Sequence, residues 1–494
     1  MTEIKTEHFK QAASSALNDE HLHGALRNLQ NRIGKGALAS YKTLPEGEGL
    51  RQVGRTIRRR TIAQLDHVLE TLAANVEKRG GHVFFAQDAA EATAYCRRVA
   101  QKHQVKRVVK GKSMLSEEIG LNPALEEDGI EVVETDLGEY IIQLAGDSPS
   151  HIIAPAIHMT RQDIGRLFEE KLGTPYTEDP PELTLIARKT LREKFLHADM
   201  GISGGNIACA ETGQVALVSN EGNIRMASTL PKVHIALIGM EKVAATLYDH
   251  HVVLRLLTRG AAAQNMSTYV SYVGGPRGND EADGPEEFHL VIVDNGRMRI
   301  LADPEFREIL HCIKCGGCLN ICPVYAKVGG HSYGFPYCGP IGTVAAPLLS
   351  GVNRAKDLIF GETLCGACRD ICPVGNDLPR MILALRFKLA QGDQAWDVTP
   401  TSQGERLGYA AWAGLVRSHT GFTLAAKAAG AGQRLLPQKD GAISTLPPPL
   451  NGWTFGRDIR LLAKDPFSVR FRRMRATSCC RPNAEPNTKE ENRD

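Results

Sequence analysis

Two short segments hold seven of the twelve cysteines in this 494-residue chain. The first segment reads CIKCGGCLNICP and contains Cys312, Cys315, Cys318 and Cys322. The second segment reads CGACRDICP and contains Cys365, Cys368 and Cys372. Thiolates at this density are typical ligands of soft metal ions and of iron–sulfur clusters. The cysteine motif is also the only internal duplication, so the two segments are expected to act together.

The spacing of the first segment, C-x2-C-x2-C-x3-C-P, is typical of cubane iron–sulfur clusters in bacterial ferredoxins. In two-cluster proteins the fourth cysteine of such a run ligates the other cluster. The predicted first set is therefore Cys312, Cys315, Cys318 and Cys372, and the predicted second set is Cys322, Cys365 and Cys368. Structural zinc is the alternative for four thiolates, but the ferredoxin signature disfavours it because it occurs once in full and once in part.

The second set has only three cysteines, so the motifs leave one of the eight ligands of two cubane clusters unidentified. When the two segments are aligned on their prolines, the slot of the missing cysteine falls on Glu362. The ligand could be Cys338, Glu362, His331, water, a substrate or a partner, and a [3Fe-4S] cluster without it is a further alternative. We expect two [4Fe-4S] clusters, with Cys338 or an exogenous ligand completing the second.

The remaining composition is that of an ordinary globular protein. The net charge of +3 gives no indication of a nucleic-acid partner. No segment has the roughly 18 apolar residues of a membrane span. A cytoplasmic location is expected, because the N-terminal residues are charged and lack the apolar stretch of a secretory signal. In that compartment thiols stay reduced, which favours metal binding over disulfides.

Side chains outside the two motifs have less specific interpretations. Cys96 and Cys209 are expected to be buried as apolar residues, and Cys479 and Cys480 to be incidental. The basic run Arg55, Arg58, Arg59 and Arg60 is expected to form a solvated helix face rather than a binding patch.

The elements that must position the cysteines begin with an alternation of strands and helices. Strands are predicted at 105–111, 130–135, 151–157, 214–220, 233–239 and 288–295. Gly129 is predicted to end a helix, and residues 274–287 are predicted to form a loop. Buried strands that alternate with helices predict an α/β layer with a mostly parallel sheet.

The composition changes near residue 300. Short helices and glycines surround the cysteines, and apolar spacing predicts a helix over 378–392. Beyond about residue 400 the chain is rich in Ala, Gly and Pro, and residues 481–494 are expected to be disordered. The predicted organisation is a helical segment (1–60), an α/β domain (61–298), an α-helical two-cluster domain (299–395) and a C-terminal region (396–494).

Three segments of the α/β region could contribute chemistry of their own. SNEGN contains Glu221, a candidate nucleophile, but a polar turn that binds a ligand or partner is the favoured interpretation. ISGGN (202–206) could surround an anion with amides if it opened a helix, and a tight turn is equally expected. Asp136 and Glu139 fit a capped helix start at least as well as acid–base catalysis.

Several longer segments together resemble a known family. GKSMLSEEIGLN, ADMGISGGNIACAETG and SNEGNIRMASTLPKVHIALIGMEK, followed by the two cysteine motifs, are similar to the lactate utilization protein B family. This family is the iron–sulfur subunit of a bacterial L-lactate oxidation system. The resemblance extends from about residue 60 to about residue 470.

The resemblance implies a LUD-type, Rossmann-like domain of the isomerase and CoA-transferase-like group, followed by the cluster domain. It implies an electron-transfer subunit of a complex that oxidises L-lactate to pyruvate and so allows growth on lactate. The implied partners are a cysteine-rich-repeat protein and a smaller LUD-domain protein. The absence of a G-x-G-x-x-G dinucleotide motif fits a multi-subunit system.

Two alternatives to an electron-transfer subunit remain. An incompletely ligated iron could bind a hydroxy acid and make the chain a catalyst, or the chain could be a non-redox assembly module.

Overall fold

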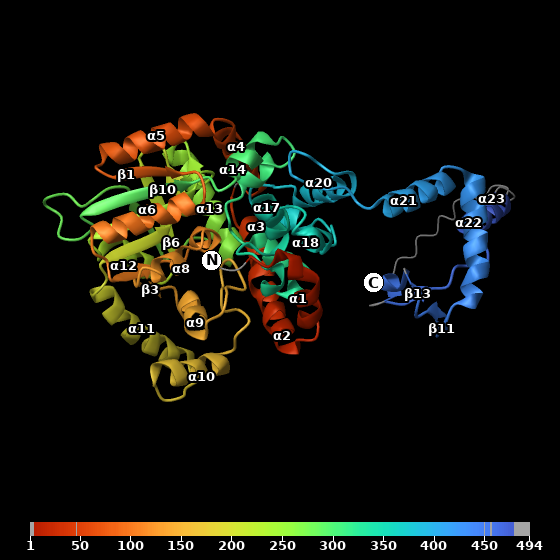
Figure 1. The fold of residues 1–494 in the computed structure, drawn as a ribbon, viewed down its shortest axis with the longest axis horizontal. Helices are drawn as coiled ribbons and strands as arrows, with labels where there is room; N and C mark the ends of the chain where they lie inside the picture. Colours follow the sequence, from red (N-terminus) through yellow and green to blue (C-terminus); the bar gives the residue numbers. More distant parts are fainter. Residues whose placement is uncertain (1–3, 46, 449, 455–456, 479–494) are drawn as a thin grey trace, which may run out of the picture. The chain divides into compact units, whose positions relative to one another are not determined.

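The computed structural model describes residues 4–45, 47–448, 450–454 and 457–478. The chain forms two compact units, residues 1–400 and residues 401–494 (Figure 1). All seven motif cysteines belong to the first unit. In the described residues, every helix is too short or too polar to cross a bilayer.

A six-stranded, fully parallel sheet forms the α/β part of the first unit. Its strand order is β1-β10-β7-β4-β2-β3. The strands are β1 (His82–Ala86), β2 (Arg107–Lys110), β3 (Glu131–Glu134), β4 (Met200–Gly204), β7 (Val233–Gly239) and β10 (Glu287–Val293). The predicted strands at 105–111, 130–135, 233–239 and 288–295 are confirmed as β2, β3, β7 and β10. The prediction of a parallel α/β sheet is therefore correct.

A second, four-stranded sheet has the order β8-β5-β6-β9. Its strands are β5 (Ile207–Cys209), β6 (Gln214–Ser219), β8 (Val243–Ala244) and β9 (Tyr269–Val273). The predicted strand at 214–220 is β6, which pairs antiparallel with both of its neighbours. The predicted loop between β9 and β10 is confirmed.

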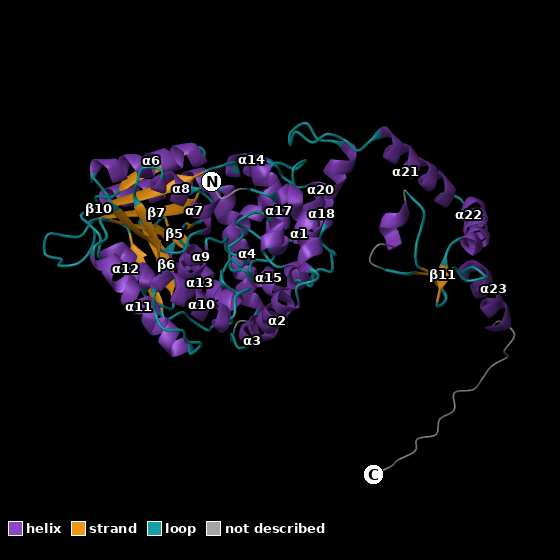
Figure 2. Cartoon of the chain, turned by 60° about the horizontal axis from the view of Figure 1, so that its bottom comes forward, coloured by secondary structure: helices purple, strands orange, loops and turns teal. Residues whose placement is uncertain are grey.

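Helices cover both faces of the parallel sheet (Figure 2). Side chains alternate along each strand, so Val108 packs with helices on one face and Val109 packs with helices on the other. The first group is α6 (Ala89–Lys102), α7 (Met114–Glu118) and α8 (Leu121–Glu126). The second includes α5 (Leu65–Lys78), α9 (Leu137–Ala145), α11 (Pro180–Leu196) and α12 (Asn223–Thr229). Because the strands are buried on both faces of the sheet, their sequences are almost continuously apolar.

The predictions of a helix stop and of two buried thiols in the α/β part are confirmed. The turn after α8 ends at Gly129, whose φ of +78° is readily adopted by glycine. Cys96 and Cys209 are buried, as predicted.

The prediction of a strand at 151–157 is wrong, because this segment bends at 151–153 and forms a turn from residue 155. The buried ring of His151 accepts hydrogen bonds at Nδ1 from the N–H groups of Ile153 and Ala154, both at 3.0 Å. Pro155 has no backbone N–H group, so it cannot donate a hydrogen bond to a neighbouring strand. The backbone donors are therefore satisfied locally, and the segment packs against the cysteine region instead of a strand.

The cysteine region consists mainly of helices, most of them only four to six residues long. They are α14 (Arg297–Ala302), α15 (Gly317–Ile321), α16 (Tyr325–Val328), α17 (Gly339–Ser350), α18 (Lys356–Phe360), α19 (Ala367–Ile371) and α20 (Leu378–Gln391). The predicted helix over 378–392 is confirmed as α20. The remaining helices of this unit are α1 (Phe9–Ala16), α2 (Glu20–Leu29), α3 (Lys35–Lys42), α4 (Glu48–Ala63), α10 (Arg161–Leu172) and α13 (Leu247–Ala262).

The basic run on α4 is solvated only in part. Arg55, Arg59 and Arg60 are exposed, but Arg58 is 1% exposed, so the prediction is wrong for Arg58. Its guanidinium donates to the carbonyls of Glu241, Val243, Leu310 and His311. Two of these carbonyls belong to the α/β part and two to the segment before the first cysteine. Four buried acceptors explain how a charged side chain is accommodated in the interior.

The second unit consists of helices and one small sheet. It contains α21 (Gln403–Val416), α22 (His419–Gly432) and α23 (Phe467–Ser478). A small sheet of order β11-β12-β13 joins β11 (Gln438–Lys439), β12 (Ala442–Ile443) and β13 (Ile459–Arg460). The predictions for Cys479, Cys480 and the tail at 481–494 lie outside the described residues.

Candidate metal centre

The two cysteine segments fold into the same local structure. Lys314 and Leu364 both have a φ of +58°, in the left-handed region that few non-glycine residues adopt. Gly316 and Gly366 follow two residues later with φ of +72° and +87°, and each precedes a five-residue helix. The loop that begins at Glu362 therefore repeats the loop that begins at Cys312.

Four cysteines from both segments line one cavity. They are Cys312, Cys315, Cys318 and Cys372. Backbone amides approach two of the sulfurs, since the N–H of Lys314 lies 3.3 Å from Cys312 Sγ and that of Asn376 lies 3.3 Å from Cys372 Sγ. Apolar side chains complete the wall, among them Ile152 and Ile341. The donor set of four thiols fits a cubane cluster, and the amides would stabilise the charge on its sulfurs.

The other three cysteines line a second cavity together with a carboxylate. Its lining includes Cys322, Cys365, Cys368 and Glu362. Glu362 Oε2 lies 3.5 Å from Cys322 Sγ. The other carboxylate oxygen, Oε1, accepts hydrogen bonds from the hydroxyls of Tyr333 and Thr343, both at 3.2 Å. These bonds orient the carboxylate and leave one oxygen directed towards the cysteines, so three thiols and one carboxylate could complete a cluster site.

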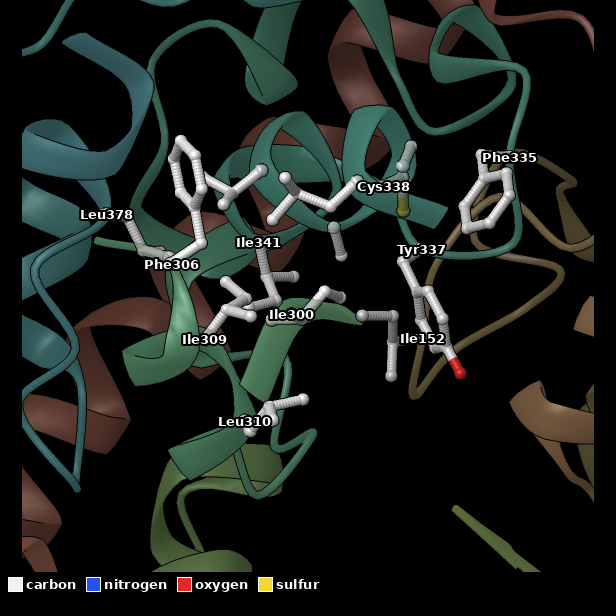
Figure 3. Close-up of a cluster of buried hydrophobic side chains, with 14 of the residues drawn as sticks. Ile152, Ile300, Phe306, Ile309, Leu310, Phe335, Tyr337, Cys338, Ile341 and Leu378 are labelled. Carbon is white, nitrogen blue, oxygen red and sulfur yellow. The ribbon is translucent and has the colours of Figure 1, made fainter. Parts of the chain in front are cut away.

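Cys338 lies outside the lining of both cavities. Its thiol is buried among apolar side chains (Figure 3) and donates to the carbonyl of Ser150 at 3.6 Å. Burial raises the pKa of this thiol to about 12, so it is a neutral hydrogen-bond donor at neutral pH.

His331 also contacts other groups. Its Nε2 bonds to the carbonyl of Ser148 at 2.7 Å, and Asp147 Oδ1 lies 3.8 Å away. With His158, these residues place three potential ligand atoms within 4.8 Å of one another. Two imidazoles and a carboxylate suit Zn²⁺ or Fe²⁺, but His158 already bonds to Asp147.

Burial raises the pKa of Cys318, Cys368 and Cys372, which favours the protonated thiol in the absence of metal. It raises the pKa of Cys372 to about 11 and that of Cys368 to about 12, and it raises the pKa of Cys318 well above its usual value. Neighbouring thiolates raise the pKa of Cys318 further. Because metals bind the thiolate, loading either cavity must release protons.

The three weaker candidates of the α/β part lie at a helix cap, in a turn and at the end of a strand. Asp136 caps α9 by accepting from the N–H groups of Gly138 and Glu139, which confirms the capped helix. Glu221 lies in the turn between β6 and α12, so the predicted polar turn is confirmed, whereas its binding of a ligand or partner stays a prediction. ISGGN does not open a helix: it forms the end of β4 and the turn that follows, so the anion site predicted on that condition is wrong.

A third cavity, of about 310 Å³, was missed by sequence analysis. Asp136, Glu221 and Gly204–Asn206 all line it, together with Lys112, Lys242 and Lys314. The signal was present in the sequence, since several of these residues follow predicted parallel strands, whose carboxyl ends meet at one edge of the sheet.

Family comparisons agree with this architecture. Residues 69–293 match the LUD domain, and residues 308–376 match the 4Fe-4S dicluster domain. The chain is thus a LUD-domain protein with a dicluster iron–sulfur region.

Whole-chain relatives define the family more closely. Lactate utilization protein B of Bacillus licheniformis is 45% identical over 465 residues, covering 94% of this chain and 96% of that protein. The protein of the same name from Bacillus subtilis is 44% identical over 470 residues, covering 95% and 96%. This chain belongs to the lactate utilization protein B family.

Among solved structures, a DUF162 family protein from Deinococcus radiodurans is similar to part of the chain. It is 14% identical, with a TM-score of 0.27, and the match covers 47% of this chain and 98% of that one.

Proposed function

We propose that this chain is the iron–sulfur electron-transfer subunit of a complex that oxidises L-lactate to pyruvate. The observation that carries the proposal is the pair of cysteine-lined cavities, each built from both motifs. The family's name links the relatives to lactate utilization, and the dicluster match supports two clusters. When bound, such clusters accept and release single electrons.

The proposed ligands of the first [4Fe-4S] cluster are Cys312, Cys315, Cys318 and Cys372. For the second cluster we propose Cys322, Cys365 and Cys368, with Glu362 as the fourth ligand. The repeated backbone and the orientation of the carboxylate favour Glu362 over Cys338. A [3Fe-4S] cluster at the second site remains the alternative, and it would leave Glu362 as a hydrogen-bonded neighbour.

The short helices separate the two sites by a small distance. Cys318 lies in α15 and Cys322 directly follows it, so four residues, about 6 Å of helical rise, separate ligands of different sites. Cys372 and Cys368 have the same relation around α19. Cys315 is buried, whereas Cys365 is exposed. Cys365 is the one exposed cysteine among the seven motif cysteines, all of which the structure describes, so we place electron exchange with a partner at Cys365.

The partners we propose are the two companion lactate-utilization proteins, a cysteine-rich-repeat protein and a smaller LUD-domain protein. Oxidation of a hydroxy acid removes two electrons and two protons, whereas each cluster accepts one electron. A partner that holds a two-electron acceptor would resolve this mismatch.

The test is the redox behaviour of the anaerobically purified chain. The proposal expects reversible reduction by dithionite, visible by EPR and by bleaching of absorbance, and no L-lactate oxidation until both companion proteins are added. Oxidation of L-lactate by the isolated chain would instead establish a catalyst. A chain without a reducible chromophore would support the assembly-module alternative.

A further inference from the structure

The third cavity lies where parallel α/β sheets bind ligands, at the carboxyl ends of their strands. Four neighbouring strands contribute to its wall. Lys112 follows β2, Asp136 follows β3, Gly205 follows β4, and Glu241 with Lys242 follows β7. The volume of about 310 Å³ is within the range of small-molecule sites.

Lysine side chains make one part of this cavity cationic. Lys112 is only 15% exposed, and its Nζ has no hydrogen-bond partner among the described residues. Glu139 Oε1 lies 3.5 Å from Lys112 Nζ. This distance allows an ion pair but is longer than that of a good hydrogen bond. Lys242 and Lys314 also line the cavity, and Lys242 Nζ donates to the carbonyl of Ile313 at 3.2 Å. The charges of Arg297 and Glu241 are paired with one another at 2.7 Å. An anionic group on a ligand would supply the acceptors that Lys112 lacks.

Two carboxyl groups line another part of the cavity, with Glu221 exposed to solvent. Glu221 Oε2 accepts from the N–H of Leu137 at 3.3 Å. Partial desolvation and then the charge of Asp136 raise the pKa of Glu221 above its usual range. A carboxyl group in this state can donate or accept a hydrogen bond, so it suits a ligand hydroxyl or oxo oxygen.

The cavity shares a wall with the first cysteine site. Ile152, Ile313 and Lys314 line both cavities. Lys314 lies between Cys312 and Cys315 in sequence, and its ammonium lies 3.7 Å from the centroid of the Tyr337 ring. A ligand bound here would be in electrostatic contact with the first cluster.

We infer that this cavity binds a small carboxylate with an adjacent hydroxyl or oxo oxygen. Lys112 binds its carboxylate, and Glu221 contacts its second oxygen. The inference rests on the proposed function for the choice of acid, and it places the acid on this chain rather than only on a partner. Lys112 and Glu221 are ligand-binding residues in this account, and no bond is made or broken by them.

The test is calorimetric titration of the anaerobic, cluster-loaded chain with L-lactate, pyruvate and propionate. L-lactate and pyruvate are expected to bind saturably, and propionate, which lacks the second oxygen, to bind more weakly. Lys112→Met should weaken binding by about tenfold to a hundredfold, as expected for the loss of a charge-assisted hydrogen bond. Glu221→Gln should reduce the preference for L-lactate over propionate. Lys189→Met, on the exposed face of α11, is the matched control and should bind like the parent.

EPR of the reduced protein provides a second readout, because ligand binding beside the first cluster should change the spectrum of the two interacting clusters. Equal binding by the parent and by Lys112→Met would overturn the inference. So would the absence of binding up to about 10 mM in protein whose clusters are intact. The latter result would leave the electron-transfer proposal standing, whereas missing clusters would contradict the proposed function itself.

Discussion

At the scale of single residues, the second cysteine site shows why a ligand cannot be chosen by residue type alone. Cys338 has the softer donor atom, but its thiol contacts the carbonyl of Ser150 and is absent from the lining of the site. Glu362 has the harder donor, but its carboxylate is held beside Cys322 by two hydroxyls. Position and orientation therefore favour the carboxylate.

Substituting these two residues separates the alternatives. Glu362→Ala is expected to lower the iron content by about one per chain, or to produce an oxidised-state EPR signal of a three-iron cluster, because the fourth ligand is lost. Cys338→Ala should retain the iron content and spectrum of the parent. Metal analysis and EPR of both variants provide the measurement. The opposite pattern, with loss only in Cys338→Ala, would exclude Glu362 as the ligand.

The spacing of the cysteines suggests the two ligand sets, because ferredoxin-like loops are local structures in which the ligands have a fixed spacing in sequence. It could not rank Cys338 against Glu362. That choice depends on Ser150, Tyr333 and Thr343, which contact the two side chains only in the folded chain. The ligand sets themselves remain proposals.

Arg58 is a second residue whose role is set by tertiary contacts. Its four backbone acceptors come from both parts of the first unit, so Arg58→Met would leave several buried carbonyls unsatisfied. We expect the free energy of unfolding to fall by about 3 kcal/mol or more. Arg59→Met, at an exposed neighbour, should change it by less than about 0.5 kcal/mol. Thermal or denaturant unfolding would measure both, and equal stability of the two variants would contradict this role.

At the scale of elements, apolar runs predicted most of the central strands but missed β1 and β4. β4 contains Gly201 and Gly204, and Gly205 follows it directly; glycines are depleted in strands, so a turn is the simpler interpretation of this segment. In the folded chain Gly201 is required by packing, because a Cβ there would lie 1.7 Å from the carbonyl oxygen of Ala227 in α12. At 151–157 a strand is predicted but does not form. There too the contacts of particular residues decide the backbone, because His151 accepts from two local N–H groups and Pro155 has none to donate.

Gly201 gives a direct test of this packing. Gly201→Ala would force α12 away from β4, and overpacking of this kind typically costs about 1–3 kcal/mol. Gly24→Ala is a matched control in α2, where the added methyl meets no atom within 4 Å. The control should be neutral or stabilise the protein by up to about 1 kcal/mol, because alanine favours helix. Unfolding free energies distinguish the two, and tolerance of Gly201→Ala would contradict the close approach.

At the scale of the whole molecule, the first unit contains every proposed cluster ligand and the third cavity. In the second unit, the side chains of two helices are largely exposed. Its helices α21 and α22 contain no buried residue, and Trp412 and Phe422 are 62% and 55% exposed.

A chain that ends at Pro400 should therefore keep its clusters. The proposed ligands and their hydrogen-bond partners all precede this residue, so iron content and reduced-state EPR are expected to match the full-length protein. Loss of iron from the shortened chain, with its secondary structure preserved in circular dichroism, would show that the second unit is needed to build or protect the sites.

The most direct test of the account is the count of iron, acid-labile sulfide and zinc per chain in anaerobically purified protein, with EPR before and after dithionite. Two cubane clusters predict about eight irons, about eight sulfides and two interacting signals that appear only on reduction. Stoichiometric zinc in place of iron, with no reducible signal, would contradict the assignment of both cavities as iron–sulfur sites.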